Sequence, residues 1–165
     1  QGTAGDLGHV AALHGGDTRC TCGNLGCLEA VASGPAIVRA LRERGVDLQD
    51  SSDLVRLAKA GDLAAATAIR DAGREIGHVL ATCVSLLNPS VIVVGGRLAQ
   101  SAESLLAGIR EVVYGRSLPL ATGDLQIVAS RTAGHAGVIG AATMVVQHVL
   151  SVEQVEHQLA AAAAG

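Results

Sequence analysis

Three cysteines close together constrain this chain more than any other feature of its sequence. They lie in the segment Cys20-Thr21-Cys22-Gly23-Asn24-Leu25-Gly26-Cys27, where two glycines let the backbone turn tightly between the thiols. Three thiols at this spacing can converge on one ion, and a closed zinc site takes four nitrogen or sulfur ligands in a tetrahedral arrangement. The segment therefore predicts a structural zinc site whose fourth ligand comes from elsewhere in the chain.

Two histidines upstream, His9 and His14, are the candidates for the fourth ligand, and spacing alone does not choose between them. The alternative is three buried or disulfide-forming cysteines without a metal. Secreted disulfide frameworks occur in small, loop-rich chains, whereas this chain has long helical patterns. The sequence thus favours a reducing compartment, and we expect a cytoplasmic protein.

Composition narrows the class of protein. With 165 residues, of which 49% are hydrophobic and 16% charged, the chain is long and apolar enough for one domain with a sizeable core. The net charge is −3 and no Lys/Arg cluster occurs, which argues against direct binding of nucleic acid by this chain. No apolar run has the length of a membrane span, so we expect no membrane partner. Because the chain begins at Gln1 within a glycine-rich stretch, we also expect a fragment of a longer protein.

The periodicity of apolar residues predicts an α/β domain over residues 1–150. Residues 1–34 lack sustained periodicity and are expected to form loops and short strands around the metal, whereas 35–150 form an α/β core. The tail 151–165 is either a helical extension or frayed. Predicted helices cover 34–45, 51–60, 62–87, 102–113 and 138–150, with a loop at 134–137 and strands at 91–94 and 125–129.

Two local details follow from the same patterns. Ser51-Ser52-Asp53 is expected to cap the second helix, and Arg39, Arg42, Glu43 and Arg44 are expected to form a solvated helix face. The run Val91-Ile92-Val93-Val94 is typical of a strand that is buried on both faces.

The cysteine segment belongs to a longer pattern. Gly8-His9, followed by Cys-x-Cys-Gly-x-x-Gly-Cys-x-Glu ending at Glu29, resembles the motif of the ROK family of repressors and sugar kinases. Residues 88–96 and 136–142 also resemble the C-terminal domain of that family, so that the resemblance covers residues 2 to about 150. It implies the C-terminal half of an actin-like, RNase H-like ATPase fold, as in sugar kinases, Hsp70 and actin, with a zinc-binding loop.

The resemblance also implies site residues. It assigns zinc to His9, Cys20, Cys22 and Cys27, which favours His9 over His14. It assigns sugar contacts to Asp6, His9 and Glu29, and the carboxylates of Asp6 and Glu29 suit sugar hydroxyls. The family has Glu where this chain has Asp6, and the shorter side chain can make that contact water-mediated or lose it. The alternatives are a ligand-free loop carboxylate for Asp6 and stabilisation of the following helix for Glu29.

A glycine pair is the candidate nucleotide contact. Gly95-Gly96 follows a strand, and in ROK kinases the corresponding region lies at the ATP site. Plain packing is the alternative, and ATP is expected only if the protein is a kinase. The family's Asp-x-Gly-x-Thr phosphate loop and catalytic Asp base do not occur in this chain. Phosphoryl transfer depends on such positioned groups, so we expect no catalysis by this chain alone.

Three functions remain open. The first is the sugar-sensing domain of a ROK transcriptional regulator, which would contact DNA only through a domain upstream. The second is the C-terminal half of a ROK sugar kinase of the glucokinase or fructokinase kind, and the third is a zinc-stabilised assembly module. Asp6 favours the regulator, because a kinase must hold its acceptor in near-attack geometry, whereas a sensor needs only differential affinity between two states.

The segment 113–122 also resembles regulators of the family from GC-rich bacteria, the actinobacteria above all. The family further implies a sugar or sugar phosphate as ligand and a homodimer or homotetramer.

Overall fold

The computed structural model describes residues 2–163, which divide after Ser130 into two compact units. Helices and strands are both present, which confirms the mixed α/β class. The predicted boundary near residue 150 stays a prediction.

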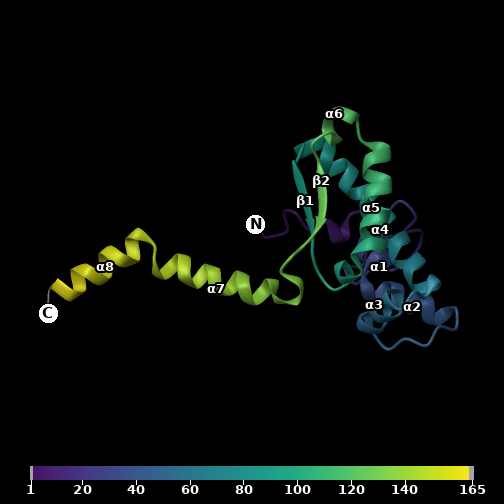
Figure 1. Cartoon of the computed structure of the whole chain (residues 1–165), viewed down its shortest axis with the longest axis horizontal. Coiled ribbons are helices and arrows are strands. Elements are labelled where there is room, and N and C mark those ends of the chain that lie inside the picture. Colours follow the sequence, from purple (N-terminus) through teal and green to yellow (C-terminus); the bar gives the residue numbers. More distant parts are fainter. Residues whose placement is uncertain (1, 164–165) are drawn as a thin grey trace. The chain divides into compact units, whose positions relative to one another are not determined.

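The first unit contains most of the regular structure (Figure 1). It begins with a loop that holds a 3₁₀ turn at Leu7–His9. Its helices are α1 (Leu28–Ala32), α2 (Gly34–Glu43), α3 (Ser51–Lys59), α4 (Leu63–Leu87), α5 (Ala102–Arg116) and α6 (Pro119–Thr122). Its strands are β1 (Val91–Val94) and β2 (Gln126–Ala129), with a second 3₁₀ turn at Leu98–Ser101. The predicted helices are present, although α5 continues three residues beyond its predicted end at Val113.

Side chains at the helix ends explain where α2, α3 and α4 begin. Ser33 accepts a hydrogen bond from the Ala36 amide, and Asp62 does the same for Ala65 at the start of α4. The predicted cap of α3 was wrong. Asp50, one residue earlier than expected, accepts the amides of Ser52 and Asp53, and these bonds lower the pKa of its carboxyl. Aspartate and serine cap equally well, so composition alone could not choose between neighbours.

Helices α4 and α5 pack closely against each other and form the centre of the core. Ile69, Leu105 and Ile109 are buried between them. The close approach depends on glycines, because a Cβ on Gly108 would clash with the carbonyl oxygen of Arg70, and one on Gly73 with that of Leu105. The helix pair thus requires positions without side chains at its crossing.

The strands β1 and β2 are parallel, with Val91 opposite Gln126 and Val94 opposite Ala129. One face of this pair packs on the helical core through Ile92, Val94 and Ile127. The prediction that β1 is buried on both faces was wrong, since Val91 is 48% and Val93 59% exposed in the described structure. A run of four β-branched residues fits a one-sided strand equally well, because side chains alternate between the faces.

The second unit consists of a 3₁₀ turn at Ala133–His135 followed by α7 (Ala136–Val149) and α8 (Val152–Ala163). Helix α7 starts at Ala136, so the predicted loop at 134–137 was wrong in its second half. The tail is helical up to Ala163, and residues 164–165 lie outside the described residues. Within the described chain, none of the helices combines the length and the apolar character that a membrane span requires.

The glycine at the crossing of α4 and α5 gives a direct test of the core. Gly108→Ala should lower the free energy of unfolding by about 3 kcal/mol, because the new methyl group meets backbone rather than a movable side chain. Gly115→Ala on the same helix is the matched control. It meets nothing within 4 Å and should be neutral or stabilising by about 0.5–1 kcal/mol. Urea unfolding measures both, and equal stabilities of the two variants would contradict the close packing.

A charged cluster on the same helix pair should make stability depend on pH. Glu111 of α5 bonds to Arg74 (3.1 Å) and Arg70 (2.9 Å) of α4, which lowers the pKa of its carboxyl. Because the pKa of this carboxyl is lower in the folded than in the unfolded protein, its ionised form stabilises the fold at any pH above the unfolded-state pKa. This stabilisation is lost as the pH falls through the folded-state pKa. Glu111→Gln should therefore lower the melting temperature at pH 7, and the difference should shrink as the pH falls below about 4 and vanish once the Glu111 carboxyl is protonated in the folded protein. A constant difference at every pH would contradict this electrostatic origin.

Candidate functional site

The four predicted metal ligands come together in the first unit. One donor atom from each of His9, Cys20, Cys22 and Cys27 lies within 4.8 Å of all the others. His9 Nδ1 is 3.6 Å from Cys20 Sγ, and Cys22 Sγ is 3.6 Å from Cys27 Sγ. Cys20 and Cys27 are buried, whereas Cys22 is exposed.

These distances fit a tetrahedral ion. Ligand bonds of about 2.0–2.3 Å around zinc place neighbouring donors about 3.3–3.8 Å apart, which includes both 3.6 Å contacts. Three thiols and one imidazole are also the donors that zinc prefers. The cluster can therefore hold a metal ion with all four positions filled by protein, a structural rather than a catalytic arrangement.

Backbone pairing within residues 11–27 builds the cluster. Isolated bridges join Ala11 to Cys27 and Arg19 to Leu25, and the amide of Cys20 donates to the carbonyl of Asn24 at 2.9 Å. The chain then turns directly into α1. Over residues 2–34 the structure has loops with isolated bridges in place of the expected short strands, and the helix α1 in this range was missed, because five residues are too few for periodicity to show.

Thiol acidity in the cluster is uneven. The backbone amide of Cys22 is the main cause that lowers the pKa of Cys20, to about 7, whereas burial raises the pKa of Cys27 to about 12. Without a metal, therefore, the Cys20 thiol ionises near neutral pH, whereas the Cys27 thiol stays protonated. Binding of a divalent ion has to displace these protons, so affinity rises with pH.

His9 faces the cysteines with one nitrogen and a carboxylate with the other. Its Nδ1 contacts Cys20, and its Nε2 lies 3.9 Å from Oδ2 of Asp6. The bond to Cys20 is the largest cause that raises the pKa of His9, followed among the raising causes by the charges of Asp6, Cys20 and Glu29. The structure brings His9, and not His14, to the cysteines; metal binding by these four residues stays a prediction.

The two predicted sugar-binding carboxylates both lie close to Gly8. A Cβ added there would be 3.2 Å from Oδ1 of Asp6 and 3.5 Å from Oε2 of Glu29. Asp6 Oδ1 also accepts the Gly8 amide at 3.0 Å and caps the 3₁₀ turn, which leaves Oδ2 directed toward His9. The structure thus gathers Asp6, His9 and Glu29 around one point next to the cysteine cluster.

A cavity of about 520 Å³ adjoins this point and has Glu29, Cys20 and Thr21 in its lining. Arg19 and Arg39 line it as well, and the sequence predicted no binding role for either. The predicted solvated face of α2 is confirmed, since Arg39 and its three charged neighbours are exposed, although Arg39 also donates to the Ala30 carbonyl at 3.0 Å. Nothing in the spacing of Arg39 indicated this contact.

Gly95 and Gly96 lie at the carboxyl end of β1, as predicted. Gly96 has φ +92°, a conformation that favours glycine, and a Cβ on Gly95 would be 3.7 Å from Ser130 after β2. The carboxyl ends of parallel strands are where α/β proteins bind nucleotides. A nucleotide contact by this pair stays a prediction.

Comparison with known proteins places these features in a family. The sequence model of the ROK family matches residues 1–148, and the chain therefore belongs to the ROK family. The chain is 32% identical to a glucokinase of Thermotoga maritima, covering 90% of this chain and 51% of the relative. It is also 32% identical to the transcriptional regulator NagC of Escherichia coli, covering 96% of this chain and 41% of the relative.

Solved structures give the same two kinds of relative. A ROK transcriptional regulator described as a homologue of the Escherichia coli MLC protein superposes with a TM-score of 0.68 at 33% identity, over 74% of this chain and 33% of the other. A ROK glucokinase of Streptomyces griseus, solved with glucose and AMPPNP, gives 0.72 at 30% identity, over 86% and 51%. The chain thus has the fold of ROK kinases and regulators, and it spans about half the length of the relatives it matches or less.

The cluster predicts the outcome of metal removal. Protein dialysed against metal-free buffer should retain about one zinc per chain, and Cys22→Ser should lose it and melt at a lower temperature. Cys22 is exposed, so loss of packing cannot account for such an effect. Cys83→Ser, outside the cluster, is the control and should keep the metal. Equal zinc content and melting temperature in the two variants would contradict the site.

Proposed function

We propose that this chain is the sugar-sensing domain of a ROK transcriptional regulator, with a structural zinc ion in the cysteine cluster. A domain outside these 165 residues would contact DNA. The observation that carries the proposal is the position of His9, with Nδ1 at the cysteines and Nε2 toward Asp6, next to Glu29. One imidazole thereby joins a metal-ordered loop to a pair of carboxylates suited to sugar hydroxyls.

Zinc supplies structural order and no chemistry in this proposal. The three cysteines and His9 would hold the ion, and this fixes the His9 ring and the loop that leads to Glu29. Asp6 is held in place by the Gly8 amide at 3.0 Å. Sugar hydroxyls then donate to Asp6 and Glu29, while the Nε2 side of His9 contacts a third hydroxyl.

Asp6 favours a sensor over a kinase. One of its oxygens caps the 3₁₀ turn, and the shorter side chain leaves only Oδ2 for a ligand. A sensor tolerates a weaker or water-mediated contact, since it needs only to bind two conformations unequally. A kinase loses rate steeply when its acceptor is misplaced by as little as about 1 Å.

The C-terminal half of a ROK sugar kinase is the second candidate. Gly95 and Gly96 at the carboxyl end of β1 favour it, because a turn there suits a nucleotide. Relatives of both kinds are equally similar to the chain, at 32% identity each. The Asp-x-Gly-x-Thr phosphate loop and the catalytic aspartate would have to come from a polypeptide segment outside these residues.

Sugar binding is tested first by calorimetry. The names of the relatives make glucose, N-acetylglucosamine and xylose the first sugars to titrate into the complete polypeptide. Glu29→Gln should weaken binding of the responding sugar at least about tenfold, since a charged acceptor of a hydroxyl bond is replaced by an amide. Glu43→Gln, an exposed carboxylate on α2, is the control. Equal affinity of both variants and the parent would remove Glu29 from the site.

A second experiment separates regulator from kinase. The complete polypeptide with the responding sugar and ATP should release no ADP above background, whereas its affinity for its own promoter DNA should change on addition of the sugar. Sugar-dependent ADP release at about 1 s⁻¹ or faster, a rate usual for enzymes, would establish the kinase instead.

A further inference from the structure

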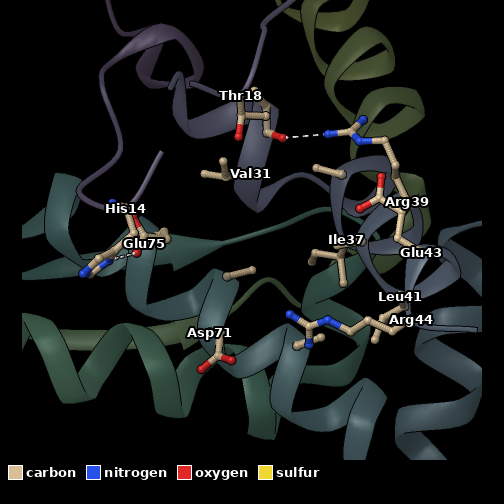
Figure 2. A pocket seen from close by; sticks show the side chains of 15 residues that line it. His14, Thr18, Val31, Ile37, Arg39, Leu41, Glu43, Arg44, Asp71 and Glu75 are labelled. Atoms are coloured by element: carbon tan, nitrogen blue, oxygen red, sulfur yellow. Dashed lines mark hydrogen bonds and ion pairs between the residues drawn. The ribbon is translucent and has the colours of Figure 1, made fainter. Parts of the chain in front are cut away.

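Two histidines and a glutamate form a second cluster, away from the four residues of the cysteine site. Glu75 and His78 are three residues apart on α4 and so lie on the same side of that helix. His14, from the loop before the cysteines, meets them there. Its amide donates to Glu75 Oε2 at 3.2 Å, and its Nδ1 is 2.5 Å from Oε1 (Figure 2).

Glu75 holds the His14 ring in one orientation. The Glu75 side chain is only 14% exposed and uses both oxygens for His14, whereas the His14 side chain is 72% exposed. With an ionised carboxylate, Nδ1 must carry the proton of this bond, so Nε2 of a neutral ring presents its lone pair away from Glu75. A carboxylate that accepts from one ring nitrogen while the other nitrogen binds an ion is a recurrent arrangement in metal sites, where it makes the imidazole a stronger ligand.

His78 supplies a second imidazole beside the first. The two ring centres are 6.1 Å apart at an angle of 66°. Imidazoles that share a zinc ion through bonds of about 2.0 Å have their ring centres about 5–6 Å apart. A shift of about 1 Å by the exposed His14 ring would therefore bring the two rings to the separation that a shared ion requires. No hydrogen bond of the His78 ring occurs within the described part of the chain, so its nitrogens are available.

Each of the two imidazoles lines a cavity that could admit an ion and its waters. One, of about 600 Å³, is lined by His14 and Glu75 (Figure 2), and the other, of about 590 Å³, is lined by His78. His14 also lies six residues before Cys20, so an ion at the pair would fasten the loop before the cysteines to α4.

We propose that His14 and His78, with Glu75 as the carboxylate that orients His14, form a second and weaker binding site for Zn²⁺ or a similar borderline divalent cation. Two protein nitrogens leave positions for water, so the site fills only after the cysteine cluster. It is independent of the sugar-sensing role.

Zinc alone is the probe that tests this site. Zinc bound to the complete chain, counted by atomic spectrometry after dialysis at increasing free zinc, should rise from about one ion to about two. His14→Asn and His78→Asn should each abolish the second ion and keep the first, and Glu75→Gln should weaken the second about 10–100-fold. His148→Asn, an exposed histidine of α7, is the matched control and should still bind two.

Two results would overturn the proposal. One is a parent protein that saturates with a single ion, and the other is a second ion that persists in the His14→Asn, His78→Asn double variant. If the variants fold poorly, the proposal can still be tested on the unaltered protein. Ni²⁺ added to zinc-loaded protein should broaden the imidazole resonances of His14 and His78 before those of His148, and broadening in the reverse order would refute the site.

Discussion

The close crossing of α4 and α5 is the constraint on which the rest of the first unit depends. Glycines at Gly73 and Gly108 allow the two backbones to touch, and the buried side chains on both sides of the crossing then fill the core. Helices α1, α2 and α3 pack on α4, while β2 packs on α5. Helix α1 carries Glu29 and follows directly on Cys27. Its packing on α4 therefore sets the position of the candidate site, although neither α4 nor α5 contributes a ligand to it.

His9 lies between two kinds of donor group. Soft thiol donors lie on one side of its ring, and hard carboxylate oxygens lie on the other. An ion at the cysteines would fix the tautomer of His9, since a nitrogen bound to metal carries no proton and leaves the other as the donor. Metal binding and sugar recognition would then be linked through the proton on Nε2 of His9.

Much of the fold could be predicted from the sequence, because α4 has an unbroken helical periodicity and ends where Asn88 takes a left-handed conformation before Pro89. The four metal candidates could be named because the cysteines are near one another and the family motif supplies His9. The contact of His14 with Glu75 could not, since it spans 61 residues and neither residue belongs to a pattern. The one-sided burial of β1 was missed for a related reason, because four apolar residues do not reveal how many layers cover a sheet.

The exposed face of β1 has a consequence for handling the protein. Val91 and Val93 present apolar side chains, and within the described structure β1 pairs with β2 on one side only, so its other edge has no neighbouring strand. Such an edge is a template on which another extended segment can add by backbone hydrogen bonds. Colloidal stability of this 165-residue chain at high concentration would therefore be governed by a strand that forms no part of its candidate binding site.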